Sequence, residues 1–167
     1  MVAVYPGSFD PVTNGHVDIV ERSARIFDRV IVAVGQHPTK RGFFPVEERV
    51  SLLEESLSHL DNVEATSFSG LVVRFCREQG ATVIVRGIRA ISDFEAEFQM
   101  GQANRQLAPG LETVFLFPEP DDQFISSSLI KEIASHGGAF ERYVPTPVAK
   151  ALLARFQDTV EGGSSPA

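Results

Sequence analysis

Five short segments of the chain carry residue types that bind phosphate groups. They run from Gly7 to His16, His37 to Lys40, Arg86 to Arg89, Asp93 to Glu97 and Ile125 to Lys131. Together they supply hydroxyl groups, imidazoles, cationic side chains and glycines, which bind anionic oxygens or let the backbone approach a ligand closely. The chemistry that this set favours is the binding and transfer of a phosphorylated group.

The first segment has the features of a triphosphate site. Gly7 allows close approach of the backbone, and Ser8 offers a hydroxyl and an N–H. His16 falls in the first turn of an expected helix, where N–H groups and the helix dipole favour anions, and its imidazole can donate to a phosphoryl oxygen. The alternative is that Asp10-Pro11 and Asn14-Gly15 only form turns and that His16 only begins a helix.

The arginines and serines of the later segments also allow two interpretations each. Arg86 and Arg89 leave an expected strand on a glycine-containing loop, where guanidinium groups suit phosphate oxygens, but they could equally be solvated surface charges. Ser126, Ser127 and Ser128 open an expected helix, so their hydroxyl and N–H groups either cap that helix or cradle a phosphate.

Three further residues have ordinary alternatives. Lys40 alone is typical of an exposed lysine. Asp93 and Glu97 are spaced to share one helix face, where solvated acids are common. Val72 follows the third expected strand, where it either belongs to the core or forms an apolar wall for a ligand.

Hydrophobic patterning predicts the elements that must position these residues. Runs rich in β-branched and aromatic residues predict five strands, at Val2 to Tyr5, Val30 to Val34, Val63 to Phe68, Thr82 to Val85 and Thr113 to Phe117. Amphipathic patterns predict six helices, at His16 to Phe27, Pro45 to Leu60, Leu71 to Gln79, Asp93 to Leu107, Ser127 to Ser135 and Pro147 to Val160.

The alternation of apolar strands and amphipathic helices predicts an α/β fold. We expect one domain, a doubly wound, Rossmann-like, five-stranded parallel sheet with helices on both faces and a C-terminal helical extension. The domain spans 1–160, and the Gly/Ser-rich tail 161–167 is expected to be disordered. Ligands of such folds bind beyond the carboxyl ends of the strands. The segments that begin at Gly7, His37 and Arg86 follow the first, second and fourth expected strands, and Pro118 to Ser128 follows the fifth.

Composition excludes several classes of protein. The formal net charge of -7 gives polyanions no general attraction, so we expect no nucleic acid partner. Cys76, the single cysteine, excludes a disulfide or thiolate metal site within the chain and is expected to be a small buried apolar residue.

No signal peptide or apolar span is apparent, so we expect a cytoplasmic protein without membrane contact. Neither G-x-G-x-x-G after the first strand nor G-x-x-x-x-G-K-[ST] occurs.

The motifs resemble those of a known family. Ser8-Phe9-Asp10-Pro11-Val12-Thr13-Asn14-Gly15-His16 resembles the extended T/H-x-G-H motif of the phosphopantetheine adenylyltransferase family, in the nucleotidyltransferase superfamily. Arg86-Gly87-Ile88-Arg89, Asp93-Phe94-Glu95-Ala96-Glu97 and the superfamily's Ile125-Ser126-Ser127-Ser128-Leu129-Ile130-Lys131 follow in the family's order. The resemblance spans roughly Val2 to Val148.

The resemblance implies transfer of the adenylyl group of ATP to 4'-phosphopantetheine, which yields dephospho-coenzyme A and pyrophosphate. The catalytic residues that it implies are His16, Lys40 and Ser8. The ATP-binding residues that it implies are Ser8, Phe9, His16, Gly87, Ile88, Arg89, Glu97, Asp122, Gln123, Phe124, Ile125, Ser126, Ser127 and Ser128. The acceptor-binding residues that it implies are Ser8, Lys40, Val72 and Arg86.

The implied reaction is an in-line attack of the acceptor phosphate on the α-phosphorus of ATP. That phosphate is already ionised, so no general base is needed, and catalysis amounts to positioning and charge neutralisation. No carboxylate cluster in the sequence indicates a dedicated metal site, so Mg²⁺ is expected to be held mainly by ATP and water. The family resemblance also implies a homohexamer, with dephospho-coenzyme A and coenzyme A as product or regulator.

Two departures from the family pattern and two competing functions stay open. Ser8 replaces a common threonine and keeps the hydroxyl, whereas Asp122 stands where many relatives carry an aromatic residue, which puts a stacking role there in doubt. The acidic stretch Glu119 to Asp122 is expected to face solvent. A sister nucleotidyltransferase that uses nicotinate mononucleotide or a polyol phosphate is the first alternative, and a non-catalytic nucleotide-binding regulator is the second.

Overall fold

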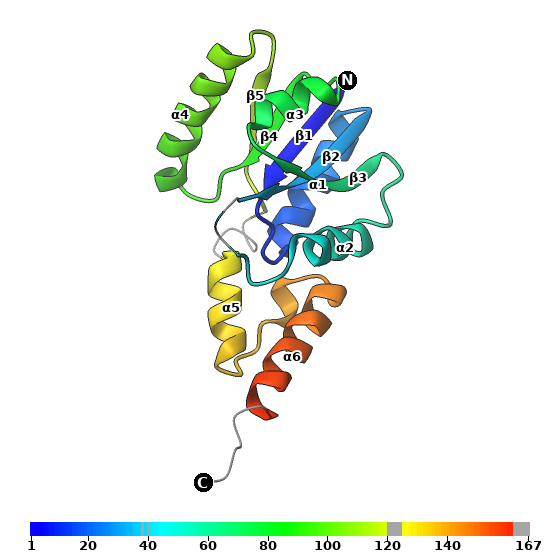
Figure 1. Ribbon diagram of the computed structural model, residues 1–167, viewed down its shortest axis with the longest axis vertical. Helices are drawn as coiled ribbons and strands as arrows, with labels where there is room; N and C mark the ends of the chain where they lie inside the picture. Colours follow the sequence, from blue (N-terminus) through cyan, green and yellow to red (C-terminus); the bar gives the residue numbers. More distant parts are fainter. Residues whose placement is uncertain (38, 40, 120–124, 162–167) are drawn as a thin grey trace.

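The computed structural model describes residues 1–37, 39, 41–119 and 125–161 (Figure 1). Its centre is a five-stranded sheet in which every pairing is parallel, with strand order β3-β2-β1-β4-β5. The strands are β1 (Val2–Gly7), β2 (Arg29–Gln36), β3 (Val63–Ser69), β4 (Val83–Gly87) and β5 (Glu112–Leu116). The predicted parallel sheet is confirmed. From β1 the chain adds β2 and β3 on one side and then β4 and β5 on the other, so the order of strand addition reverses between β1 and β4.

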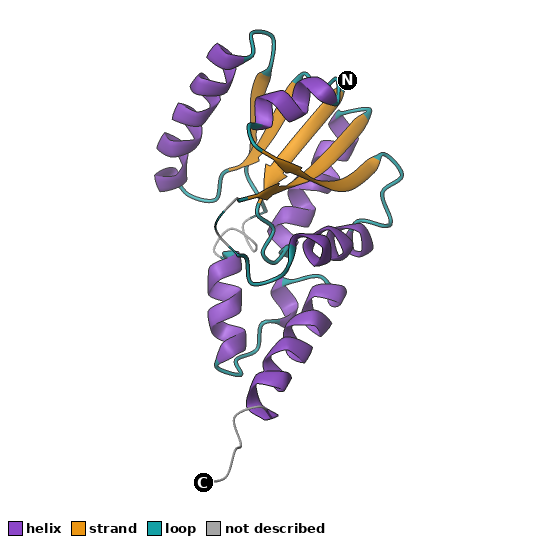
Figure 2. Cartoon of the chain, in the orientation of Figure 1, coloured by secondary structure: helices purple, strands orange, loops and turns teal. Residues whose placement is uncertain are grey.

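The helices alternate with the strands along the chain (Figure 2). They are α1 (Asn14–Ile26), α2 (Val46–Ser56), α3 (Val72–Glu78), α4 (Ile91–Leu107), α5 (Ser127–Ser135) and α6 (Thr146–Glu161), with a short 3-10 helix η2 (Glu141–Tyr143). The strand order and this alternation confirm the predicted doubly wound α/β architecture.

The sheet is buried on both faces, which explains the nearly continuous apolar character of its central strands. Successive β2 residues alternate between two hydrophobic clusters: Val30 and Val32 join α1, α2, α5 and α6, while Ile31 and Ala33 join α3. Cys76 lies on α3 in the second cluster as a buried free cysteine, as the sequence predicted. Burial raises the pKa of its thiol to about 11.

The C-terminal helices lie beyond the carboxyl ends of the strands. Figure 1 shows α5 and α6 below the arrowheads of the sheet, at the edge where the phosphate-binding segments emerge. Ile130 of α5 and Leu152 of α6 are fully buried in the same cluster as the sheet residue Val32. The C-terminal helices therefore share the hydrophobic cluster that covers one face of the sheet.

Helix α2 ends earlier than the sequence predicted. The apolar spacing predicted a helix through Leu60, but α2 ends at Ser56 and a turn follows, in which the Leu60 N–H donates to the Leu57 carbonyl at 3.0 Å. The side-chain amide of Asn62 donates to the carbonyls of Ala24 and Phe27, at 2.8 and 3.0 Å. These two bonds hold the segment after α2 against the end of α1. Such a long-range contact cannot be predicted from the spacing of apolar residues along a helix.

Helix α4 lies along the outer edge of the sheet beside β5 (Figure 1). Among its described side chains only Asn104 is buried, with 6 % of its surface exposed. Four large apolar side chains of α4 are exposed, namely Phe94, Phe98, Met100 and Leu107. Over the described part of the chain, no helix has both the length and the apolarity needed to cross a bilayer.

Candidate active site

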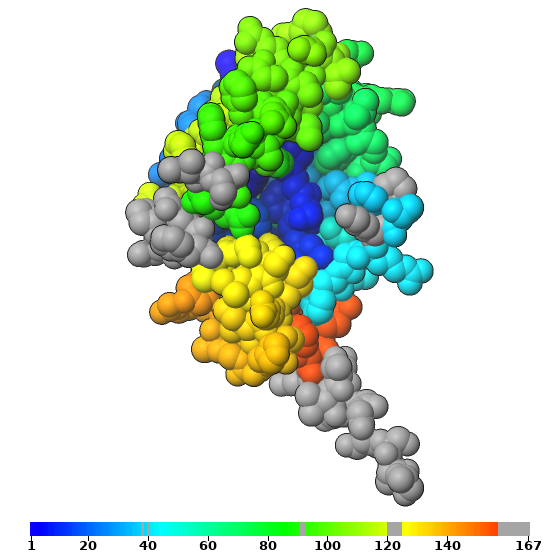
Figure 3. Space-filling view, turned by 90° about the vertical axis from the view of Figure 1, so that its left-hand side faces the viewer, coloured from blue at the N-terminus to red at the C-terminus, as the bar shows by residue number. Residues whose placement is uncertain are grey.

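Two pockets open side by side at the carboxyl edge of the sheet. Figure 3 shows the hollow they occupy, with the N-terminal segment in blue at its floor, α4 above it and α5 below. One, the apolar pocket, has a volume of about 490 Å³, and the other, the polar pocket, about 410 Å³. Ser8 and Arg86 line both pockets, as do Pro6 and Gly7. A group bound between Ser8 and Arg86 therefore faces both cavities.

The polar pocket collects most of the residues that the sequence predicted. It is lined by Ser8, Phe9, His16, Arg86, Gly87, Arg89, Asp93, Glu97, Ser126, Ser127 and Ser128, together with Tyr5, Pro6, Gly7 and Ala96. These residues come from the ends of β1 and β4 and from the beginnings of α1, α4 and α5. The parallel sheet brings all of these segments to one edge, as expected for a doubly wound fold.

His16 is held by the start of its own helix. Thr13 caps α1, and the Thr13 N–H donates to Nδ1 of His16 at 3.0 Å, while the His16 N–H approaches the Thr13 hydroxyl. The ring also packs edge-on against Phe9, with 5.1 Å between centroids. Because Nδ1 accepts a hydrogen bond, neutral His16 carries its proton on Nε2, which becomes a donor.

The imidazole of His16 stays neutral near pH 7. Burial and, to a smaller extent, the positive charges of Arg89 and Arg86 together lower its pKa from 6.5 to about 4. His16 is thus both a helix-start residue and a preorganised hydrogen-bond donor. The two interpretations drawn from the sequence are compatible in the structure.

Arg86 lines both pockets and forms an ion pair with Glu97. Its Nε donates to Oε2 of Glu97 at 2.6 Å, its Nη2 donates to Oε1 of the same carboxylate, and its Nη1 donates to the Pro6 carbonyl at 2.7 Å. Burial opposes the charge of Arg86, but the hydrogen bonds and negative charge of Glu97 outweigh it and raise the pKa of the guanidinium. Two of its five N–H groups take no partner among the described residues.

Arg89 and the serines at the beginning of α5 also line the polar pocket. Arg89 Nε lies 3.6 Å from a carboxylate oxygen of Asp93, which is in the first turn of α4 rather than at its cap, since the N-cap is Ala90. Ser126 caps α5 by accepting from the Leu129 N–H at 3.1 Å. Ser127 donates to the Pro11 carbonyl at 2.7 Å, which ties α5 to the loop after β1.

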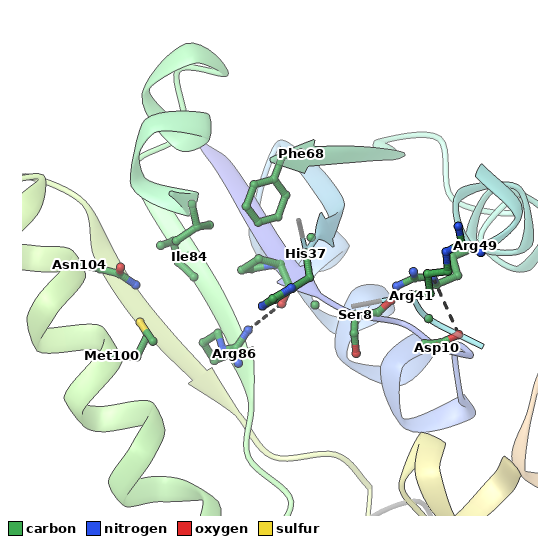
Figure 4. Close-up of a pocket in the computed structure, with 15 residues that line it drawn as sticks. Ser8, Asp10, His37, Arg41, Arg49, Phe68, Ile84, Arg86, Met100 and Asn104 are labelled. Atoms are coloured by element: carbon green, nitrogen blue, oxygen red, sulfur yellow. Dashed lines mark hydrogen bonds and ion pairs between the residues drawn. The ribbon is translucent and has the colours of Figure 1, made fainter. Parts of the chain in front are cut away.

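The apolar pocket has an apolar wall and a cationic rim (Figure 4). Phe68, Val72, Ile84 and Met100 form the wall, so Val72 lies where a ligand's apolar part would contact it. The cations Arg41, Arg49 and Arg86 and the imidazole of His37 line the side nearest Ser8 in Figure 4, and Asn104 of α4 adds an amide. Such a cavity suits a ligand with a long, weakly polar body and an anionic end.

The remaining predicted residues lie elsewhere or outside the described residues. Ile88 is 2 % exposed and its N–H donates to the Leu116 carbonyl at 2.9 Å, so its side chain belongs to the core and lines neither pocket. Ile125 lines a small adjoining cavity of about 50 Å³ with His16 and Arg89. Glu119 is exposed, as expected. Outside the described residues lie Lys40, Asp122, Gln123 and Phe124.

Sequence reasoning missed several polar residues of the site. Asp10 and Asn14 stand in the family motif, and the only specific role weighed for them was the alternative one of forming turns. In the structure the Asp10 carboxylate accepts from the Phe43 and Phe44 N–H groups, and Asn14, which lines neither pocket, donates to the Arg142 carbonyl at 2.9 Å. His37 was included in one of the phosphate-binding segments without a role of its own, and Arg41, Arg49 and Asn104 were not singled out. The signal available for them was only their place after β2 or on one face of a helix.

The described residues contain no group of three or more His, Cys, Asp or Glu side chains placed to hold a metal ion. The two carboxylates in the polar pocket, Asp93 and Glu97, are each paired with an arginine. The donors that face this pocket are cations, hydroxyls and helix beginnings, a set that binds phosphate oxygens rather than a bare cation.

Comparison with known proteins agrees with this chemistry. Residues 4–133 match the model of the cytidylyltransferase-like family. A solved structure from Vibrio parahaemolyticus, described as a nicotinate-nucleotide adenylyltransferase, has the same fold, with a TM-score of 0.69 and 16 % identity over 92 % of this chain and 91 % of that chain. The fold and the paired pockets therefore define an α/β nucleotidyltransferase.

Two full-length relatives narrow the class. A phosphopantetheine adenylyltransferase of Thioalkalivibrio sulfidiphilus is 57 % identical over 155 residues, which cover 93 % of this chain and 98 % of the relative. One of Heliobacterium modesticaldum is 53 % identical over 161 residues, 96 % of each chain. The chain belongs to the phosphopantetheine adenylyltransferase family.

Proposed function

We propose that this protein transfers the adenylyl group of ATP to 4'-phosphopantetheine and releases pyrophosphate and dephospho-coenzyme A. The two relatives named phosphopantetheine adenylyltransferase support this reaction. The observation that carries the proposal is that a polar and an apolar pocket meet at Ser8 and Arg86. One cavity suits a nucleoside triphosphate and the other a phosphorylated, weakly polar chain, so their junction is where two phosphates can react.

ATP binds in the polar pocket in this proposal. The Nε2–H of His16, the guanidinium of Arg89 and the N-terminus of α5 at Ser126 to Ser128 supply donors to the triphosphate. Ser8 adds a hydroxyl at the junction of the pockets. Because His16 is neutral, it donates without the cost of holding a buried positive charge.

The acceptor binds in the apolar pocket. Its pantetheine arm lies along Val72, Phe68 and Met100, and its phosphate lies at the junction, within reach of the two N–H groups of Arg86 that bond no other described residue. This orientation directs a phosphate oxygen toward the α-phosphorus of ATP. Lys40, expected from the family motif to contact the reacting phosphates, lies outside the described residues.

The chemical step is an in-line displacement. An oxygen of the acceptor phosphate forms a bond to the α-phosphorus, and the bond from the α-phosphorus to the bridging oxygen breaks, so pyrophosphate leaves with that oxygen. The attacking oxygen carries no proton near neutral pH, and His16, with its pKa of about 4, is suited to donate a hydrogen bond rather than to remove a proton. Catalysis therefore rests on orientation and on stabilising negative charge.

Mg²⁺ enters this site with ATP in the proposal. The ion is held mainly by phosphate oxygens and water, because the carboxylates of the polar pocket, Asp93 and Glu97, are engaged by arginines. Bound there, it neutralises charge on the phosphates of ATP. We expect chelation of Mg²⁺ with excess EDTA to abolish turnover and added Mg²⁺ to restore it.

Pyrophosphate release with ATP and each of three acceptors tests the function. We expect release with 4'-phosphopantetheine and none with nicotinate mononucleotide or a polyol phosphate, and mass spectrometry of the product should show dephospho-coenzyme A. Release only with the mononucleotide would replace the proposed acceptor. Binding of ATP without release for any acceptor would identify a regulator instead.

Self-association completes the proposal. Helix α4 exposes Phe94, Phe98 and Leu107 outside both pockets, and several large exposed apolar side chains on one helix are typical of a protein interface. We propose that copies of this chain associate through α4 into a homohexamer, as the family resemblance implies. The proposed setting is the cytoplasm, and coenzyme A and dephospho-coenzyme A compete for the apolar pocket because they contain the same arm.

A further inference from the structure

A buried carboxylate lies where three parts of the site meet. Asp10, 9 % exposed, follows Ser8 in the loop after β1. Its Oδ2 accepts from the Phe43 N–H at 2.7 Å and its Oδ1 accepts from the Phe44 N–H at 2.9 Å. These two bonds fix the segment before α2 against the loop that carries Ser8. Nothing in the mechanism above uses Asp10.

Two cations surround the Asp10 carboxylate, one from each neighbouring helix. Arg49 of α2 is 6 % exposed, and its Nε lies 3.9 Å from Oδ1. Lys131 of α5 places its Nζ 3.6 Å from Oδ2. Asp10 therefore contacts the end of the loop after β2, the first turns of α2 and the helix that begins at Ser126 to Ser128.

Arg49 extends the same network to Ser8 itself. Its Nε donates to the Phe44 carbonyl at 2.8 Å, and its Nη1 donates to the Ser8 carbonyl at 3.0 Å. The packing leaves no spare room, because a Cβ on Gly42 would lie 2.5 Å from Arg49 Nη2 and 3.0 Å from Asp10 Oδ2. Gly42, Asp10 and Arg49 all line the apolar pocket, so the network forms part of its wall (Figure 4).

We propose that Asp10 is a positioning residue for adenylyl transfer, which holds the loop after β2, the Ser8 loop and helix α5 in the relative arrangement that the reaction needs. A negative charge beside a phosphate site repels its ligands, so electrostatics alone disfavours a carboxylate at this position. The benefit lies in geometry, since small misplacement of reacting groups costs orders of magnitude in rate. The inference rests on the proposed function for its kinetic test.

The charge and the geometry of Asp10 predict opposite results for Asp10→Asn. If Asp10 acted only through its charge, its neutralisation would lower the KM for ATP and for 4'-phosphopantetheine and leave kcat unchanged. If Asp10 positions the loops, the variant loses kcat, because the Asn amide presents an NH₂ group to one of the two backbone N–H donors and that bond is lost. We expect kcat to fall about tenfold to a hundredfold, with each KM changed by less than about threefold.

Two further variants separate positioning from general loosening. Arg49→Lys keeps the positive charge but cannot bond both the Ser8 and Phe44 carbonyls, and it should lower kcat in the same way. Glu78→Gln is the control: it removes the negative charge that pairs with Arg74 at 2.9 Å, an exposed ion pair on α3 that contacts neither Asp10 nor the Phe43–Phe44 segment. Its kcat should stay within about twofold of the parent value.

Hydrogen exchange gives a readout that does not depend on turnover. The amides of Phe43 and Phe44 should exchange faster in Asp10→Asn, while the fully buried strand amides of β2 should keep their protection. If the parent protein does not turn over 4'-phosphopantetheine, the proposed function fails. Exchange at Phe43 and Phe44 still tests whether Asp10 holds this segment in place. Unchanged exchange, an unchanged kcat in Asp10→Asn, or an equal loss of kcat in Glu78→Gln would overturn the inference.

Discussion

His16 connects the stability of the protein to pH. Its pKa is about 4 in the folded protein and 6.5 in an unfolded chain, so the unfolded chain binds more protons between these values. Its contribution to stability is therefore fully present above pH 6.5 and is lost as the pH falls toward 4. Between pH 7 and pH 4.5 we expect His16 to reduce the free energy of unfolding by about 2 kcal/mol.

Urea unfolding at these two pH values measures the effect. His16→Gln is the matched variant, because glutamine at the third helical position can keep the reciprocal hydrogen bonds with Thr13 but cannot titrate. The variant should lose less stability than the parent on acidification. Equal losses in both proteins, or an imidazole NMR titration near pH 6.5, would contradict a depressed pKa for His16.

The same side chain carries a kinetic prediction. His16→Ala removes the Nε2–H donor from the polar pocket, and we expect kcat to fall about a hundredfold or more with only a modest change in ATP affinity. Steady-state kinetics and calorimetry with ATP measure the two quantities. His59→Ala is the control, since His59 is bonded to Glu21 outside both pockets. An unchanged kcat in His16→Ala would remove this residue from the mechanism.

At the scale of elements, the close turn at the end of β1 depends on Gly7. Gly7 is the last residue of β1, and a Cβ there would lie 2.9 Å from the ring of Phe9, which is 2 % exposed and has a φ of 45°. The ring cannot move aside, because it packs edge-on against Tyr5 and His16. The close turn that brings Ser8 to the junction of the pockets thus requires glycine at position 7.

Gly7→Ala should therefore destabilise the protein by about 1–3 kcal/mol, the usual cost of forcing a methyl group into a packed core. Gly35→Ala near the end of neighbouring β2 is the control, because a Cβ at Gly35 comes no closer than 3.6 Å to any atom. Thermal or urea unfolding of the two variants provides the comparison. A loss of stability at Gly35 equal to that at Gly7 would show that the Phe9 contact is not the cause.

The elements also show what the sequence can and cannot predict. Strands β1, β2 and β4 are predictable because burial on both faces leaves uninterrupted apolar runs, and the parallel order follows from alternation with helices. That Ser8, His16 and Arg86 line one pocket is predictable, because Ser8 and His16 follow β1, Arg86 lies at the end of β4, and each belongs to a motif of the family. Their meeting at one edge is a consequence of the parallel sheet.

Contacts between distant backbone groups leave no such pattern. Asp10 accepts from backbone N–H groups 33 and 34 positions away. Because nearly every residue type has a backbone N–H, the sequence does not mark which residues supply these donors. Pairing of Arg86 with Glu97 is also hidden, because the sequence offers Asp93 and Glu97 on one helix face and does not say which arginine meets which acid. These parts of the site require the folded structure.

At the scale of the whole molecule, α4 is incompletely covered. It has 17 residues, and Phe94, Phe98, Met100 and Leu107 are between 45 % and 56 % exposed. The same helix supplies Glu97 to the polar pocket and Met100 and Asn104 to the apolar pocket. An interface through α4 would therefore stabilise the helix that forms one wall of both cavities.

Phe98→Glu tests this connection, because a charge at the centre of an apolar interface is costly to bury and Phe98 lines neither pocket. We expect sedimentation velocity to show a smaller assembly for the variant and turnover per chain to rise with protein concentration, as association restores the wall formed by α4. Ile26→Glu, at a similarly exposed apolar residue at the end of α1, should keep the parent assembly. A parent protein that sediments as a monomer, or a Phe98→Glu variant that keeps the parent assembly, would show that α4 is not the interface.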